Sequence, residues 1–166
     1  MTAAFIGLGS NLNDPPRQLQ RAVTALGALP DSTVARVSSV YASAPVGPTD
    51  QPDYLNAVLL LETALPPAAL LRALQDIEDA QGRERGERWG PRTLDLDLLL
   101  YGDLVLRDAD LTLPHPHMHE RDFVLYPLRE ISDTNLVLPD GSDIDSLAAA
   151  CRGNRLARTD WKLRAR

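Results

Sequence analysis

The sequence predicts an α+β fold, a ferredoxin-like β-α-β-β-α-β sandwich with an added hairpin strand and a C-terminal extension. Strand-like and helix-like hydrophobic patterns follow one another in this order, and prolines and glycines separate them at positions typical of element ends. The chain has 166 residues, enough for one core without disulfides. We therefore expect a single domain over residues 1–166, with the helices on one face of an antiparallel sheet.

The N-terminal part of the chain predicts a strand and then a helix. Residues 3–8 form a short apolar strand pattern. The segment Asn13-Asp14-Pro15-Pro16 is typical of a helix start, because a capping residue precedes prolines in the first turn. Apolar residues then recur at helical spacing until Gly27 and Pro30 end the helix.

The middle of the chain predicts two further strands and a second helix. Residues 33–43 are rich in β-branched side chains, and residues 55–63 form a third strand after a proline-bearing loop. Pro66 and Pro67 open a helix that has one apolar face, and Gly82 ends it.

A fourth strand carries two acidic residues and follows an arginine-rich loop. The turn at Gly102-Asp103 and residues 104–106 predict that this strand continues into a hairpin. Residues 144–151 predict a helical segment in the C-terminal extension, and Cys151 in this apolar run is expected to pack in the core.

The two acids, Asp95 and Asp97, predict a metal site. Side chains alternate along a strand, so both carboxylates project from one face while Leu94, Leu96 and Leu98 pack into a core. Their spacing of roughly 6 to 7 Å suits hard cations bridged by phosphate oxygens, since Mg²⁺ prefers one or two carboxylates together with phosphates and water. The alternative is a pair of solvated side chains on an edge strand, which the poor strand propensity of Asp and the repulsion between neighbouring carboxylates disfavour.

Composition excludes several classes of function. A formal net charge of −6 argues against a nucleic-acid partner, and 5% aromatic residues without an alternating pattern argue against an RNA-binding sheet. No apolar run reaches the length of a membrane span, and no secretory signal is apparent, so we expect a cytoplasmic protein without a membrane partner. The single cysteine fits a reducing compartment.

Any polyphosphate ligand must be held by arginines and cations. Arg83, Arg85, Arg88 and Arg92 crowd one short loop, whereas Lys162 is the only lysine in the chain. No Gly-Lys-Ser/Thr triplet exists, which excludes a P-loop. The Gly-rich and Arg-rich loop at residues 82–91 is expected to act as a lid that excludes water.

Three histidines alternate at His115, His117 and His119, shortly before Arg121. A zinc site is one interpretation, which the intervening proline and the lack of a nearby cysteine disfavour, and a surface loop with incidental histidines is another. We favour contacts from His115 and Arg121 to a phosphate or nucleotide, because both lie at a loop-to-helix junction.

A proline-stiffened loop after Ser43 and the strand start at Tyr54 predict a pocket for a flat heterocycle. The amide of Asn56 offers a donor and an acceptor to a ring edge, and Tyr54 and Phe123 can enclose the ring. The alternative is that Tyr54 belongs to the core and Asn56 to a bulge or turn. Glu78 lies near a helix C-terminus and either faces the site or reaches solvent at the helix edge.

The stretch Arg-Trp-Gly-Pro-Arg-Thr-Leu-Asp-Leu-Asp at residues 88–97 resembles the signature of the 6-hydroxymethyl-7,8-dihydropterin pyrophosphokinase family. The resemblance covers nearly the whole chain, with further matches at residues 9–12, 51–56 and 113–128. It implies transfer of pyrophosphate from ATP, the co-substrate, to the hydroxymethyl group of the reduced pterin in folate biosynthesis, with release of AMP. It also implies two Mg²⁺ ions, and we expect a monomer that acts on small-molecule substrates.

The resemblance also implies roles for individual residues. The catalytic residues would be Arg83, Arg92, Asp95 and Asp97, of which Asp95 and Asp97 hold the metal. The nucleotide contacts would be Gln75, Glu78, Arg85, Trp89, Arg92, Leu98, Thr112, His115 and Arg121. The pterin contacts would be Ser43, Ala44, Pro45, Val46, Tyr54, Asn56 and Phe123.

This chain departs from the family pattern at several positions. It has Ser43-Ala44-Pro45 where Thr-Pro-Pro is common, Pro116 where a tyrosine often stands, and Asp110 where some members carry a basic residue. Two other classes of function use similar residues: a Mg²⁺-dependent nucleotidyltransferase or phosphohydrolase, which would release pyrophosphate or orthophosphate, and a non-catalytic binding module, which would bind its ligand equally well in EDTA.

Overall fold

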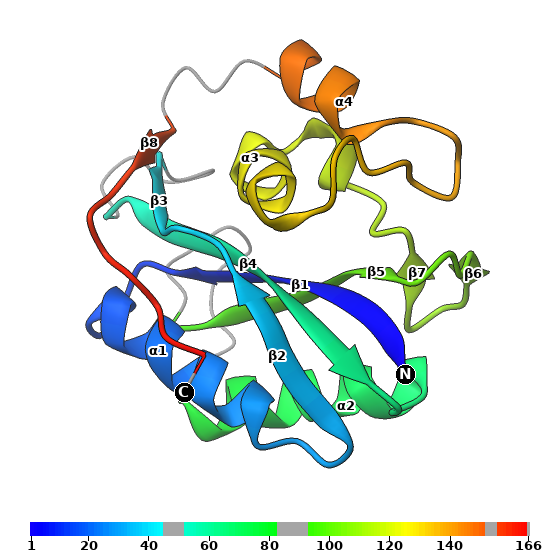
Figure 1. Ribbon diagram of the computed structural model, residues 1–166. Coiled ribbons are helices and arrows are strands. Elements are labelled where there is room, and N and C mark those ends of the chain that lie inside the picture. Colours follow the sequence, from blue (N-terminus) through cyan, green and yellow to red (C-terminus); the bar gives the residue numbers. More distant parts are fainter. Residues whose placement is uncertain (45–51, 83–92, 152–155, 166) are drawn as a thin grey trace.

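The computed structural model of the protein describes residues 1–44, 52–82, 93–151 and 156–165. Some of the predicted site residues lie outside these ranges, namely Pro45, Val46, Arg83, Arg85, Trp89 and Arg92. Within the described ranges, an antiparallel sheet of six strands forms the centre of the molecule, and helices lie on both of its faces (Figure 1).

The sheet runs in the order β5-β1-β4-β3-β8, and β2 also pairs with β4. All of these pairs are antiparallel. The strands are β1 (Thr2–Ser10), β2 (Ser32–Val37), β3 (Tyr41–Ser43), β4 (Tyr54–Thr63), β5 (Asp95–Tyr101) and β8 (Ala157–Arg158). The acid-bearing strand β5 is therefore an edge strand of the described sheet, and the long strand β4 lies near the middle.

The two helices of the predicted unit share one face of the sheet, as expected, but further helices cover the other face, which the sequence prediction did not include. One layer consists of α1 (Pro15–Gly27) and α2 (Pro67–Ala80), and the other contains α3 (Asp122–Ile131) and α4 (Ile144–Ala150) (Figure 1). Each layer has its own apolar cluster against the sheet. A strand that is covered on both faces has a continuous apolar run, which explains why all of residues 57–61 in β4 are buried.

The predicted strand at residues 33–43 is two strands, β2 and β3. The hydroxyl of Ser38 accepts a hydrogen bond from Val58 N–H at 2.9 Å. In a regular strand pair a main-chain carbonyl would accept this hydrogen bond. The Ser38 N–H donates to Val58 C=O at 2.9 Å, so the chain stays at the edge of β4 while the strand is interrupted.

The predicted hairpin after β5 is also wrong. Gly102 makes the expected turn with a positive φ of 53°, but residues 104–106 do not return along β5. Instead β6 (Leu106–Arg107) pairs with β7 (Thr112–Leu113) in a separate two-stranded sheet. The outer edge of β5 meets the segment that follows β7, where His115 N–H donates to Leu99 C=O at 2.9 Å.

The helix ends follow the sequence prediction more closely. Asp14 occupies the N-cap of α1 in a left-handed conformation, although its side chain makes no capping hydrogen bond. A short 3-10 helix, η1 (Met118–Glu120), leads into α3. Cys151 ends α4 and packs against the apolar cluster of that layer, as expected. In the described part of the chain, no helix is long and apolar enough to cross a membrane.

Candidate active site

The two aspartates of β5 project from the same face of the sheet, as the strand period predicts. Leu96 and Leu98 are buried on the opposite face, in the cluster under α1 and α2. Asp95 and Asp97 are half-buried and line a pocket of about 100 Å³ on the face that α3 covers. The acid pair therefore does not lie on a wholly solvated surface.

Two glycines of β1 leave space beside the aspartates. In the antiparallel pair of β1 and β5, Gly7 lies opposite Asp97 and Gly9 lies opposite Asp95, and both glycines line the same pocket. A glycine within a strand often marks a close approach of a ligand to the backbone. The sequence prediction missed this role, although two glycines spaced like the two aspartates were the signal for it.

Two of the predicted pterin residues, Tyr54 and Asn56, line the same pocket from β4. Asn56 is 4% exposed and lies inside β4, so the interpretation as a bulge or turn residue is wrong. Its amide Nδ2 donates to Ser43 Oγ at 2.7 Å. Tyr54 begins β4 and lines the pocket rather than the core. Ala44 directly follows β3.

The start of α3 closes the pocket from the other side. Arg121 is the N-cap residue of α3, and both Arg121 and Phe123 line the pocket together with the aspartates. The Arg121 guanidinium lies 5.7 Å from the centre of the Phe123 ring, a cation–π distance. Residues far apart in the sequence thus place carboxylates, an amide, aromatic rings and a guanidinium around one small space.

His115 borders the site as a neutral side chain. Its Nε2 lies 3.9 Å from Asp97 Oδ1, which is too long for a hydrogen bond. Burial, followed by the positive charge of Arg121 and the nearby His117, lowers the pKa of His115 to about 4. The His117 N–H donates to His115 Nδ1 at 3.2 Å, so the proton of the neutral ring is on Nε2, facing Asp97.

The three alternating histidines do not converge on a zinc site. The rings of His115 and His117 are 6.0 Å apart at their centres, and His119 instead contacts Asp140 at 2.8 Å. Among the described residues, no group of three or more His, Cys, Asp or Glu side chains could hold a metal ion.

Glu78 is a buried side chain and does not reach solvent at the helix edge. It is 5% exposed, and its Oε2 accepts a hydrogen bond from Leu96 N–H at 2.8 Å. Leu96 stands between Asp95 and Asp97, so Glu78 holds the strand segment that carries the acid pair. The sequence prediction considered only contact with ligand or solvent for this residue.

The remaining predicted nucleotide residues lie in different places. Gln75 lines a pocket of about 480 Å³ between α2 and the β6–β7 pair, and Asp110 and Leu111 line the same pocket. Thr112 follows directly in β7. Leu98 is 3% exposed and belongs to the core, so its side chain lines neither of these two pockets.

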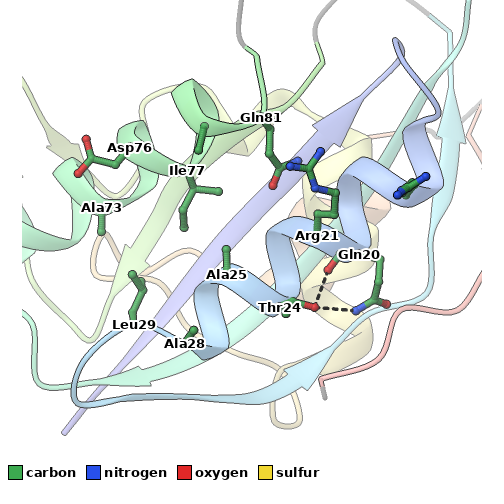
Figure 2. Close-up of a pocket in the computed structure, with 12 residues that line it drawn as sticks. Gln20, Arg21, Thr24, Ala25, Ala28, Leu29, Ala73, Asp76, Ile77 and Gln81 are labelled. Carbon is green, nitrogen blue, oxygen red and sulfur yellow. Dashed lines mark hydrogen bonds between the residues drawn. The ribbon is translucent and has the colours of Figure 1, made fainter.

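A larger pocket of about 750 Å³ lies between α1 and α2, in the helix layer on the other side of the sheet (Figure 2). Its lining is mostly apolar, with Ala25, Leu29 and Ile77 among the residues, and Arg21 and Asp76 at its rim (Figure 2). None of the described residues predicted for the site lines it. Size alone therefore does not identify the functional pocket.

Comparison with known proteins decides the family. The model of the family described as 7,8-dihydro-6-hydroxymethylpterin-pyrophosphokinase matches residues 5–133. The chain belongs to this family. It is therefore an enzyme of the pyrophosphokinase class.

Curated relatives agree with this family. A 2-amino-4-hydroxy-6-hydroxymethyldihydropteridine pyrophosphokinase of Haemophilus influenzae is 52% identical over 147 residues, which cover 89% of this chain and 91% of that protein. A protein of the same name from Pseudomonas aeruginosa is 50% identical over 147 residues, with 89% and 90% of the two chains covered.

Solved structures support the fold. The wild-type HPPK-DHPS of Plasmodium falciparum superposes with a TM-score of 0.69 at 11% identity, over 90% of this chain and 44% of that chain. An HPPK-DHPS in complex with substrates also gives 0.69, over 90% of this chain and 45% of that one. The chain thus spans less than half the length of these structures, and at such identities the likeness shows the fold alone.

Proposed function

We propose that the protein transfers the pyrophosphoryl group of ATP to the hydroxymethyl oxygen of 6-hydroxymethyl-7,8-dihydropterin and releases AMP, a step in folate biosynthesis. The observation that carries this proposal is that the carboxylates of Asp95 and Asp97 share one pocket with Asn56 and Phe123. This transfer needs one group of side chains that binds the phosphates through metal ions, and another that binds the pterin ring. The two carboxylates fit the first role, and the Asn56 amide fits the second. Relatives about half identical to this chain bear the name of this activity.

The acid pair fits magnesium. Two carboxylates on one strand face, with glycines opposite, leave the remaining coordination positions to phosphate oxygens and water, as Mg²⁺ prefers. We propose two Mg²⁺ ions, held by Asp95 and Asp97, on the strength of the family resemblance. When bound, they would neutralise charge on the phosphates as the bond to the leaving AMP breaks.

Side chains around the acid pair would orient the two substrates. The Nδ2 of Asn56 donates to Ser43 Oγ, which leaves the side-chain carbonyl oxygen of Asn56 for the pterin edge. Tyr54 and Phe123 would flank the ring. Neutral His115 offers its Nε2–H beside Asp97 without adding charge, and Arg121 supplies a guanidinium for phosphate. Catalysis by these groups would consist of positioning and electrostatic stabilisation.

The family resemblance supports further assignments. We propose phosphate contacts for Arg83 and Arg92, nucleotide contacts for Gln75, Arg85, Trp89, Leu98 and Thr112, and an indirect part in the nucleotide site for Glu78. We propose Ser43, Ala44, Pro45 and Val46 as the loop side of the pterin pocket. The burial of Glu78 favours an indirect role for that residue, through the strand that it supports.

We also propose a ferredoxin-like fold, one domain over residues 1–166, and a monomer in the cytoplasm. The strand order β5-β1-β4-β2, joined by α1 and α2, supports the fold. The lone cysteine supports a reducing compartment.

Incubation with ATP, Mg²⁺ and the reduced hydroxymethylpterin tests the function. We expect one AMP for each pyrophosphorylated pterin, and no AMP when either the pterin or the metal is left out. Release of orthophosphate or free pyrophosphate would instead favour a phosphohydrolase or a nucleotidyltransferase. Ligand binding without turnover, unchanged in EDTA, would favour a binding module.

A further inference from the structure

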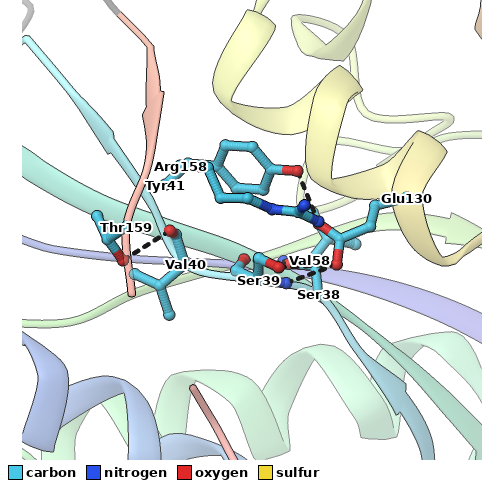
Figure 3. A network of polar contacts seen from close by, with 8 residues as sticks. All are labelled: Ser38, Ser39, Val40, Tyr41, Val58, Glu130, Arg158 and Thr159. Atoms are coloured by element: carbon cyan, nitrogen blue, oxygen red, sulfur yellow. Dashed lines mark hydrogen bonds and ion pairs between the residues drawn. The ribbon is translucent and has the colours of Figure 1, made fainter. Parts of the chain in front are cut away.

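A single carboxylate on α3 is contacted by three residues from two other segments of the chain. Glu130 Oε2 accepts from Ser39 N–H at 2.9 Å and from Ser39 Oγ at 3.0 Å. Its Oε1 accepts from Tyr41 Oη at 2.7 Å and contacts Arg158 Nη2 at 2.9 Å. Figure 3 shows these side chains between α3, the start of β3 and the C-terminal strand β8. We call Glu130, Ser39, Tyr41 and Arg158 the Glu130 cluster.

The cluster adjoins the wall of the pterin pocket through β3. Tyr41 and Ser43 are two residues apart in β3 and therefore share one face. Tyr41 pairs with Asn56 and Ser43 pairs with Tyr54 in β4, and paired residues of neighbouring strands point to the same side. The hydroxyl of Tyr41 thus reaches Glu130 on the same face of the sheet from which Asn56 lines the pocket and binds Ser43.

The cluster also adjoins the opposite wall of the pocket through α3. Phe123 stands seven residues before Glu130 on this helix, which is two turns, so both lie on the same side of it. Phe123 lines the pocket, and Glu130 binds β3. Glu130 thus ties the helix that carries Phe123 to β3, the strand that pairs with β4 at Asn56.

The C-terminal segment takes part in the cluster. In β8, Arg158 pairs with Tyr41 in register, and both Thr159 N–H and Thr159 Oγ1 donate to Val40 C=O at 2.8 Å (Figure 3). The family model ends at residue 133. A segment beyond the matched region thus supports the strand that leads into the pterin loop.

The hydrogen bonds of the cluster are charge-assisted, because Glu130 is ionised and Tyr41 keeps its proton. Partial burial raises the pKa of Glu130, but the hydrogen bonds from Tyr41, Ser39 and Arg158 together hold it below its ordinary value. Burial, and then the hydrogen bond to Glu130, raise the pKa of Tyr41 to about 12. At neutral pH a carboxylate therefore accepts from a protonated phenol, the stronger kind of hydrogen bond.

We propose that Glu130 is a positioning residue for the pterin: it fixes α3 against β3, and so sets the width of the pocket between Phe123 and Asn56. This inference rests on the proposed function. Glu130 does not line the pocket, so it acts on the substrate only through these two walls. The nucleotide side, near His115 and Gln75, has no member of the cluster.

The test compares kinetic constants for the two substrates. We expect Glu130→Ala to raise KM for the pterin about tenfold, equivalent to about 1.4 kcal/mol, and to change KM for ATP less than about twofold. Glu130→Gln keeps an acceptor for Ser39, and Tyr41→Phe keeps the ring, so each should give part of the effect. These milder variants decide the question if Glu130→Ala does not fold.

A matched control lies just beyond the same end of α3. Asp133 binds Arg36 of β2 at 3.2 Å, and its side chain is 91% exposed. Asp133→Ala removes the ion pair with Arg36 of β2. This contact does not involve β3, the strand next to the pterin pocket. Because exposed ion pairs contribute little, we expect both KM values to stay at wild-type levels.

Two results overturn the inference: an unchanged KM for the pterin in Glu130→Ala, or an equal rise in both KM values. A wild-type protein that forms no AMP with the pterin would overturn the proposed function itself. The two failures are therefore distinguishable in one set of assays.

Discussion

Replacing Gly9 with alanine is expected to weaken substrate binding without lowering the stability of the fold. A Cβ built on Gly9 comes 3.5 Å from Asn56 Oδ1 and 3.9 Å from Tyr54 Cδ1. These are ordinary contact distances, so the methyl group fits without moving the backbone. Alanine is favoured over glycine within a strand by about 0.5 to 1 kcal/mol. We therefore expect the free energy of unfolding of Gly9→Ala to equal or exceed that of the wild type.

The same methyl group is harmful inside the pocket, whose volume is about 100 Å³. One methylene too many or too few in a binding pocket changes binding by about 1 to 3 kcal/mol. We expect KM for the pterin to rise at least about tenfold, which corresponds to the lower end of that range. KM for ATP is measured alongside, because Gly9 also lies opposite Asp95 in β5.

Steady-state AMP formation with each substrate varied in turn, together with urea unfolding, measures both effects. Gly27→Ala is the matched control, since its Cβ would meet Val34 Cγ2 at 3.7 Å and Ala165 O at 3.8 Å, outside the pocket. It should leave both KM values unchanged. A Gly9→Ala protein with wild-type KM for the pterin, or one that is clearly less stable, would refute this reasoning.

Three further substitutions test other parts of the molecule. Glu78→Ala leaves the N–H of Leu96 buried without its acceptor, so we expect a loss of about 1 to 3 kcal/mol in urea unfolding, and a change under about 0.5 kcal/mol would contradict the role of Glu78. Asn56→Ala removes the acceptor for the pterin edge and the donor to Ser43, and we expect KM for the pterin to rise by at least about 30-fold with little change for ATP; equal effects on both substrates would argue against a pterin contact. The pKa of Glu130 lies below its ordinary value of 4.5 in the folded protein, so its stabilising effect is present above that pH and is lost as pH falls through the folded value. The difference in unfolding free energy between wild type and Glu130→Gln should therefore be full at pH 7 and should narrow below pH 4.5, and a difference that does not vary with pH would contradict the clustered hydrogen bonds.

Local chemistry made the acid pair and the helix starts predictable from the sequence. The period of two in a strand places Asp95 and Asp97 on one face whatever the rest of the fold does, and prolines at the first turn define where α1 and α2 begin. Both predictions depend only on residues that are close in sequence.

Contacts between distant segments account for what the sequence prediction missed. Ser38 interrupts a strand because its hydroxyl binds Val58, and Glu78 turns inward because Leu96 offers an N–H 18 residues later. The unbroken apolar run at residues 57–61 was the signal for the second helix layer. In a strand with one solvent-exposed face, apolar and polar residues would alternate. That signal was readable, whereas the two hydrogen bonds depend on the assembled fold.

The most direct test is calorimetric binding of a non-hydrolysable ATP analogue with and without Mg²⁺. We predict that the wild type binds the analogue when Mg²⁺ is present and loses this binding in EDTA. We also predict that Asp97→Ala loses the cation-dependent binding and all turnover while its circular dichroism spectrum is unchanged. Binding that is insensitive to EDTA, or a folded Asp97→Ala protein with wild-type affinity, would contradict a metal site formed by Asp95 and Asp97.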